Sequence, residues 1–127
     1  MTLVNGFKDF CNKVGINLNE VYEARMENAT IFSFAETSDE NMNYNVMLIL
    51  YDDNKSADVW VRKPITNLNI LEKLNDLNLD YGIYTFAVSG DTLISKCSVD
   101  TNSDINVVLK KMMDMLKVAR KEFKKFK

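Results

Sequence analysis

Two stretches of the sequence carry apolar residues at the spacing of one face of an α-helix. Over residues 2–14 they recur every three or four positions, and Gly15 follows as a natural C-terminal stop. A longer stripe follows the capping residues at 100–104 and runs to about Phe126. Its members step alternately by four and three: Ile105, Leu109, Met112, Leu116, Ala119, Phe123 and Phe126. We expect an amphipathic helix in each place.

Between these helices, β-branched and aromatic runs alternate with short polar connectors. The runs at 30–35, 44–51 and 57–62 read as strands, and the short connectors favour consecutive antiparallel pairing. The middle run is apolar on both faces, with Val46, Leu48 and Leu50 on one and Met47, Ile49 and Tyr51 on the other. We therefore expect it to be a central strand whose two faces are both covered.

A second helix and a hairpin are predicted in the remaining segment. Pro64 ends the third strand, and Thr66 can cap a short helix whose leucines recur at i+3 steps: Leu68, Leu71, Leu74 and Leu77. Runs at 83–88 and 92–99 then flank Ser89-Gly90-Asp91, which predicts a tight turn between two strands.

The element order α-β-β-β-α-β-β-α predicts an α+β fold with a five-stranded antiparallel sheet flanked by helices. With one proline, four glycines and no internal repeat, the 127 residues show no linker, so residues 1–127 are expected to form a single domain. The N-terminal stretch does not resemble a signal peptide, and no apolar run is long enough to span a bilayer. Two cysteines without paired spacing favour reduced thiols, so we expect a cytoplasmic protein.

The chain lacks the residues that most catalytic and metal sites need. It contains no histidine, which removes the commonest general base and transition-metal ligand. Two aspartate-rich stretches, starting at Asp52 and Asp100, lack the glycine and glutamate that a calcium-binding EF-hand loop requires. No glycine-rich phosphate loop is present. We therefore expect no cofactor, no metal and no enzymatic activity.

Charge is distributed unevenly along the chain. Residues 110–127 hold eight Lys or Arg and two carboxylates, a net +6, so the overall charge of -2 leaves -8 on the rest. A basic helix can simply present a solvated face, or it can bind an anionic partner such as nucleic acid. The candidate anion-binding residues are Lys117, Lys121, Lys124 and Lys125.

The stretch Leu71-Glu-Lys-Leu-Asn-Asp-Leu-Asn78, followed by the segments 81–88 and 91–99, resembles the YbjN-like family, which shares its fold with type III secretion chaperones. Asn75 and Asn78 stand where the family carries an Asn-x-x-Asn step on a leucine-rich short helix. The resemblance implies an antiparallel sheet flanked by helices, frequent dimerisation and protein-binding roles, with no catalytic residues to carry over.

The missing catalytic groups, the seven methionines and the resemblance together favour a non-enzymatic protein-binding or chaperone-like adaptor. The alternative is a small nucleic-acid-binding protein that uses the basic C-terminal helix. The identity of a protein partner is open.

We also expect a homodimer, because the sequence is more apolar than one small sheet and three helices can hide. The predicted second helix is the expected contact, with its four leucines toward the core and Ile70 at an uncharged margin. Trp60 lies on the strand face opposite Val59 and Val61, either as an interface anchor or as ordinary core. The candidate interface residues are Trp60, Leu68, Ile70, Leu71, Leu74, Asn75 and Asn78.

Overall fold

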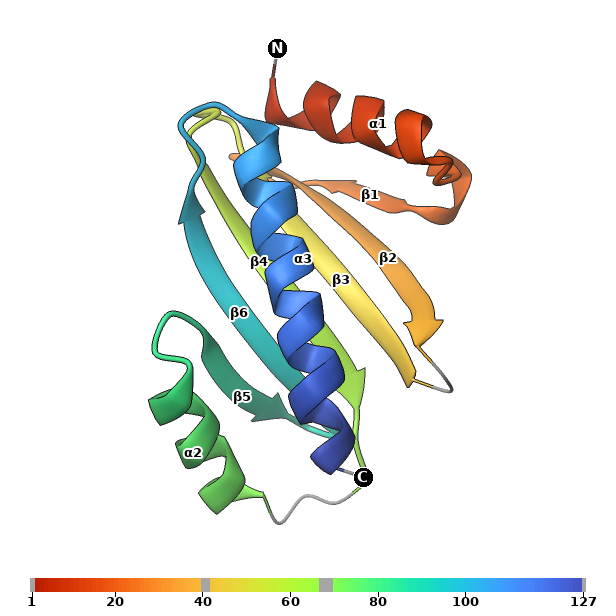
Figure 1. The fold of residues 1–127 in the computed structure, drawn as a ribbon. Coiled ribbons are helices and arrows are strands. Elements are labelled where there is room, and N and C mark those ends of the chain that lie inside the picture. The colour runs from red at the N-terminus through yellow and green to blue at the C-terminus, as the bar shows by residue number, and fades with distance from the viewer. Residues whose placement is uncertain (1, 40–41, 67–69, 127) are drawn as a thin grey trace.

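The computed structural model describes residues 2–39, 42–66 and 70–126 of the chain (Figure 1). These residues contain three α-helices and six antiparallel strands. The α+β class is confirmed. In chain order the elements are α1 (Leu3–Val14), β1 (Tyr22–Arg25), β2 (Ala29–Asp39), β3 (Met42–Tyr51), β4 (Ser56–Pro64), α2 (Leu71–Asp80), β5 (Thr85–Ser89), β6 (Thr92–Asp100) and α3 (Ile105–Glu122). Short 3₁₀ turns lie at Leu18–Glu20 and Phe123–Lys125.

The strands form one sheet in the order β1-β2-β3-β4-β6-β5, and every neighbouring pair is antiparallel. The predicted meander of β2, β3 and β4 is confirmed, as is the hairpin of β5 and β6, where Gly90 takes a left-handed turn conformation with φ 61°. After β4 the chain passes through α2 and re-enters the sheet at its outer edge as β5. Strand β6 then lies between β5 and β4 and pairs with both. Strand β3 lies between two neighbours, which confirms its central position.

The expected five-stranded sheet is wrong by one strand, because β1 pairs with β2 at the edge of the sheet. Its four residues, Tyr22–Arg25, are exposed or only half-buried on both sides. A strand that covers no core carries no alternation of apolar and polar residues, so the pattern that revealed the other strands is missing here.

Helices α1 and α3 lie on the same side of the sheet in Figure 1, so together they cover one face of it, whereas both faces were expected to be covered. Helix α1 ends at Gly15 as predicted, with φ 78°, and it begins after Thr2, whose side chain accepts a hydrogen bond from the Asn5 N–H. The Asp104 carboxylate caps α3 by accepting from the Asn106 N–H. Both helices therefore begin at a side-chain cap, and α1 also ends at a residue that favours a helix stop.

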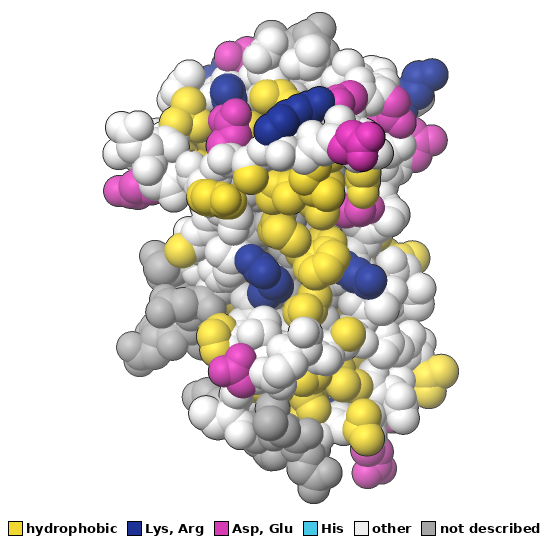
Figure 2. All heavy atoms as spheres, turned by 180° about the vertical axis from the view of Figure 1, so that it is seen from behind, with side chains coloured by type: hydrophobic (Ala, Val, Ile, Leu, Met, Phe, Trp, Pro, Cys, Tyr) yellow, Lys and Arg dark blue, Asp and Glu magenta, His cyan; other side chains and the backbone are white. Residues whose placement is uncertain are grey.

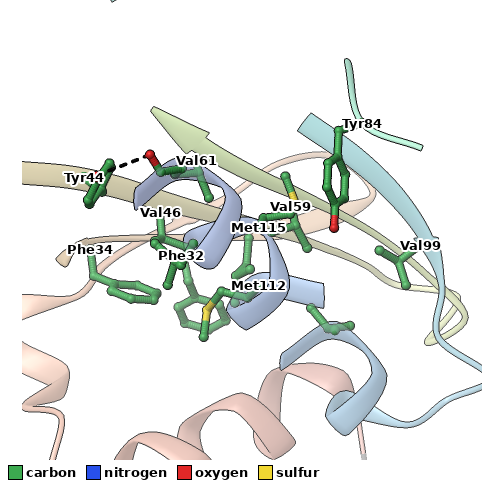
Figure 3. Packing of buried hydrophobic residues seen from close by; sticks show 14 of the residues in the cluster. Phe32, Phe34, Tyr44, Val46, Val59, Val61, Tyr84, Val99, Met112 and Met115 are labelled. Carbon is green, nitrogen blue, oxygen red and sulfur yellow. Dashed lines mark hydrogen bonds between the residues drawn. The ribbon is translucent and has the colours of Figure 1, made fainter. Parts of the chain in front are cut away.

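The core fills the space between these helices and one face of the sheet. On the strands, Val46, Leu48, Val59 and Val61 are fully buried. Figure 3 shows Val46, Val59 and Val61 in one cluster with Met112 and Met115 of α3. The predicted stripe is confirmed, since its members from Leu109 to Phe126 are all buried. Where α1 meets the core, the rings of Phe7 and Phe32 lie 4.6 Å apart.

Helix α2 begins later than predicted and presents a different face. It starts at Leu71 with Ile70 as its N-cap, so Thr66 is not the cap, and Leu68 lies outside the described residues. Ile70 is 2% exposed, whereas Leu71 is 75% exposed, so the expected placement of these two is wrong. Residues three apart on an α-helix differ by about 300°, so a strict i+3 series turns away from any one face. The buried side instead steps by four and three through Ile70, Leu74 and Leu77.

No helix in the described ranges is long and apolar enough to cross a bilayer.

Candidate functional site

The face of the sheet opposite α3, called here the open face, carries apolar side chains that no described helix covers. Figure 2 shows this side of the molecule, where hydrophobic side chains run down the middle with basic side chains beside them. Its central members are Ile31, Met47, Ile49 and Trp60, all half-buried. They form a continuous group, because Ile31 pairs with Ile49 across β2 and β3, and Met47 pairs with Trp60 across β3 and β4.

Trp60 is the largest side chain at the centre of this face. Its neighbours in sequence, Val59 and Val61, are fully buried on the other side, so the period-two alternation of a strand turns the indole away from the core. On β6 the cross-strand partner is Lys96, whose Nζ lies 5.5 Å from the centre of the Trp60 ring. A small hollow of about 170 Å³ adjoins the ring toward Ile83. A half-buried indole beside a hollow and a cation is typical of a contact site for another molecule.

Polar and charged groups on the open face are held in place by neutral partners. The Asp58 carboxylate accepts hydrogen bonds from the Tyr51 hydroxyl and the Ser98 hydroxyl, both at 2.7 Å. The Asp58 carboxylate also raises the pKa of Tyr51, because the hydrogen bond favours the protonated phenol. Arg62 donates from Nε to the Asn45 amide oxygen at 3.2 Å. The orientation of an acid and a base on β4 is therefore fixed by uncharged side chains.

The candidate interface residues on α2 do not lie on one surface. Leu74 and Ile70 are buried in the core, while Leu71 and Asn75 are exposed. The Asn78 amide receives a hydrogen bond from the Phe86 N–H and donates one to the Phe86 carbonyl, at 2.8 and 3.0 Å. Asn78 therefore satisfies the N–H and carbonyl groups of Phe86 on the edge strand β5, and these hydrogen bonds join α2 to the sheet. Trp60 lies apart from α2, on the open face.

The outer side of α3 carries the predicted basic residues. Lys117, Lys121 and Lys124 are all exposed and step by four and three, so they line one side of the C-terminal segment. Within the described ranges, none of the three makes an ion pair with a carboxylate. Lys125 belongs to the 3₁₀ turn that follows α3.

The described residues contain no group of three or more Cys, Asp or Glu side chains arranged to hold a metal ion. Cys11 and Cys97 are both free, and burial raises the pKa of each thiol. A thiol with a raised pKa stays protonated at neutral pH and is a weak nucleophile.

Sequence reasoning singled out Trp60 and missed the residues around it. Asp58 and Arg62 lie on the same face as Trp60 because each is two positions away on β4. The two-residue period of a strand is enough to predict this from the sequence. Met47 and Ile49 were recognised as apolar on the second side of β3, but that side was expected to be covered.

Comparison of the sequence with protein-family models gives no match, and neither does comparison with curated proteins. The resemblance to the YbjN-like family therefore stays a prediction that rests on the leucine pattern and on Asn75 and Asn78.

Proposed function

We propose that this protein is a non-enzymatic protein-binding module of the chaperone-like adaptor kind, and that its partner docks on the open face. The observation that carries this proposal is the second apolar side of β3, where Met47 and Ile49 lie beside Trp60 without a covering helix from the described residues. Contiguous apolar surface of this kind marks interaction sites in soluble proteins. Tryptophan is also among the residue types that dominate binding energy at interfaces.

The composition of the open face fits protein recognition. Its centre is apolar and aromatic, and its charged groups, Asp58, Arg62 and Lys96, flank the Trp60 row. Protein interfaces commonly combine an apolar centre with polar groups near the rim.

Affinity capture with matched variants tests the proposal. Trp60→Ser removes the indole from the open face, whereas Leu79→Ser removes an apolar side chain that is 82% exposed on α2. We expect the wild type and Leu79→Ser to retain the same specific protein from lysate of the source cells, and Trp60→Ser to lose it. Retention of that protein by Trp60→Ser, or absence of any specific partner, would contradict the proposal. Thermal melts of all three proteins control for folding.

A second candidate function is nucleic-acid binding through α3. The observation in its favour is the exposed row of Lys117, Lys121 and Lys124, none ion-paired to a carboxylate among the described residues. Binding of this type weakens with salt, with a slope of log K against log salt of about −0.9 for each phosphate neutralised on duplex DNA. A gel-shift titration at low salt tests it, with replacement of the three lysines by serine as the control. Absence of any shift with DNA or RNA would end this candidate.

A further inference from the structure

The two charges of β4 on the open face are arranged symmetrically about Trp60. Asp58 and Arg62 lie two residues before and after it on β4, so all three side chains share one face. Each charge is about 6.6 Å along the strand from the tryptophan, on opposite sides. Acid, indole and base thus follow one another in a straight row.

Neither charge in this row has an ionic partner within the described ranges. Asp58 accepts hydrogen bonds from the hydroxyls of Tyr51 and Ser98, and Arg62 donates one to the amide oxygen of Asn45. All three partners are neutral side chains. The ion pairs of Lys8 with Glu23 and of Arg25 with Asp52 lie elsewhere. An oriented acid and an oriented base are therefore both available to a partner that presents the opposite charges at the same separation.

A second copy of the same chain presents those charges when it is turned by a two-fold axis. The axis lies between the two sheets, passes over Trp60 and runs across the strands, so it reverses the direction of β4. Asp58 of each copy then faces Arg62 of the other, and Trp60 and Met47 approach their own counterparts. An isologous interface of this kind uses one self-complementary patch twice. Sheets that pack face to face in this way lie about 10 Å apart with interdigitating side chains.

We propose that the occupant of the open face is a second copy of this chain, in an antiparallel, two-fold symmetric sheet-on-sheet dimer joined by two Asp58–Arg62 pairs. This inference rests on the proposed function, since it names the protein that the open face binds. It differs from the contact expected from the sequence, because α2 takes no part in it.

Charge reversal tests the arrangement. Wild-type protein should scatter light as a dimer, with close to twice the 14.6 kDa chain mass. Asp58→Arg alone makes both facing pairs basic, and Arg62→Asp alone makes both acidic, so each should weaken the dimer at least about tenfold. The matched controls are Asp114→Arg and Lys117→Asp, which make the same changes at exposed positions of α3 and should leave the dimer intact.

Mixing the two open-face variants gives the most specific result. A chain with Arg at 58 and 62 faces a chain with Asp at both positions, so both pairs match and a heterodimer should form. The double variant Asp58→Arg with Arg62→Asp should likewise recover the homodimer. Mixing the two α3 control variants should produce no tighter association than wild type. Thermal melts of each variant confirm that the fold survives.

A variant of Lys96 distinguishes a second copy of the chain from an acidic partner as the occupant of the open face. Lys96 shares the cross-strand row of Trp60, so in the proposed dimer it approaches its own counterpart. Lys96→Met should therefore tighten the dimer, and weaker association would contradict the arrangement. A monomeric wild type at high concentration, or single charge reversals that leave the dimer unchanged, would overturn the inference. If the chain is monomeric while Trp60→Ser still loses a captured protein, the proposed function stands and only the identity of the occupant is wrong.

Discussion

The two faces of the sheet come from the same strands but differ in what covers them. On the face under α3, alternate residues of β3 and β4 are fully buried, including Leu48 and Val59. On the open face, the intervening residues Ile49 and Trp60 are only half-buried and share the surface with Asp58. A strand that is apolar on both sides needs two covers, and the described chain provides one. The difference separates what stabilises the fold from what is available to a partner.

The largest expected effect comes from neighbouring residues of β3 that point to opposite faces. Leu48→Ala should lower the free energy of unfolding by about 2–5 kcal/mol, because it leaves a cavity in the core. Ile49→Ala should lower it by less than about 1.5 kcal/mol, because its side chain is already partly in water. Denaturant unfolding in dilute protein, where association is negligible, measures both. Equal losses would mean that the open face is covered within the chain.

The layer over the buried face should also resist added volume. A Cβ at Gly6 of α1 would lie 2.8 Å from Cγ2 of Ile105 at the start of α3, closer than van der Waals contact allows. Gly6→Ala should therefore destabilise the protein by about 1–3 kcal/mol, despite the higher helix propensity of alanine. Thermal unfolding measures the effect, and Ile105→Ala in the same chain should recover part of it. A stabilised Gly6→Ala variant would show that α1 and α3 can move apart.

The edge of the sheet offers a comparison between two asparagines of α2. Asn78→Ala removes both hydrogen bonds to the Phe86 backbone and should cost about 1–3 kcal/mol. Asn75→Ala, at an exposed position of the same helix, should change stability by no more than about 0.5 kcal/mol. Hydrogen exchange at the Phe86 amide gives a local measurement, since protection should fall only in Asn78→Ala. Equal stability and equal protection of the Phe86 amide in the two variants would refute the role of Asn78 in satisfying the backbone of β5.

The smallest expected effect is a loss of stability at alkaline pH that draws on both sides of the molecule. Hydrogen bonds to Asp58 and Glu122 raise the pKa of Tyr51 and Tyr81 respectively. A folded-state pKa above the unfolded value, about 10, means that this contribution is complete below about pH 10 and is lost as the pH rises through the folded pKa. Denaturation midpoints should therefore fall less steeply above about pH 10 in a double Tyr→Phe variant than in wild type. Identical slopes would contradict this assignment.

Local signals in the sequence were sufficient for much of the fold. Gly15 ends α1 as predicted, and the stripe of α3 is buried as its spacing required. The strand centres and the β5–β6 hairpin also followed from pattern. Strand β1 was not predicted, because its exposed edge residues show no alternation of apolar and polar side chains. The predicted buried side of α2 was wrong, because i+3 spacing alone does not define one side of a helix.

The sequence by itself determined which residues share a face, because the periods of helices and strands are local properties of the backbone. Thus Asp58, Trp60 and Arg62 were bound to lie together on β4, and Met47 and Ile49 on β3. Only the tertiary structure decided which face α3 covers, and that β5 is an edge strand whose backbone Asn78 must satisfy. These outcomes depend on contacts between segments far apart in the chain, where packing and hydrogen-bond satisfaction outweigh any local pattern.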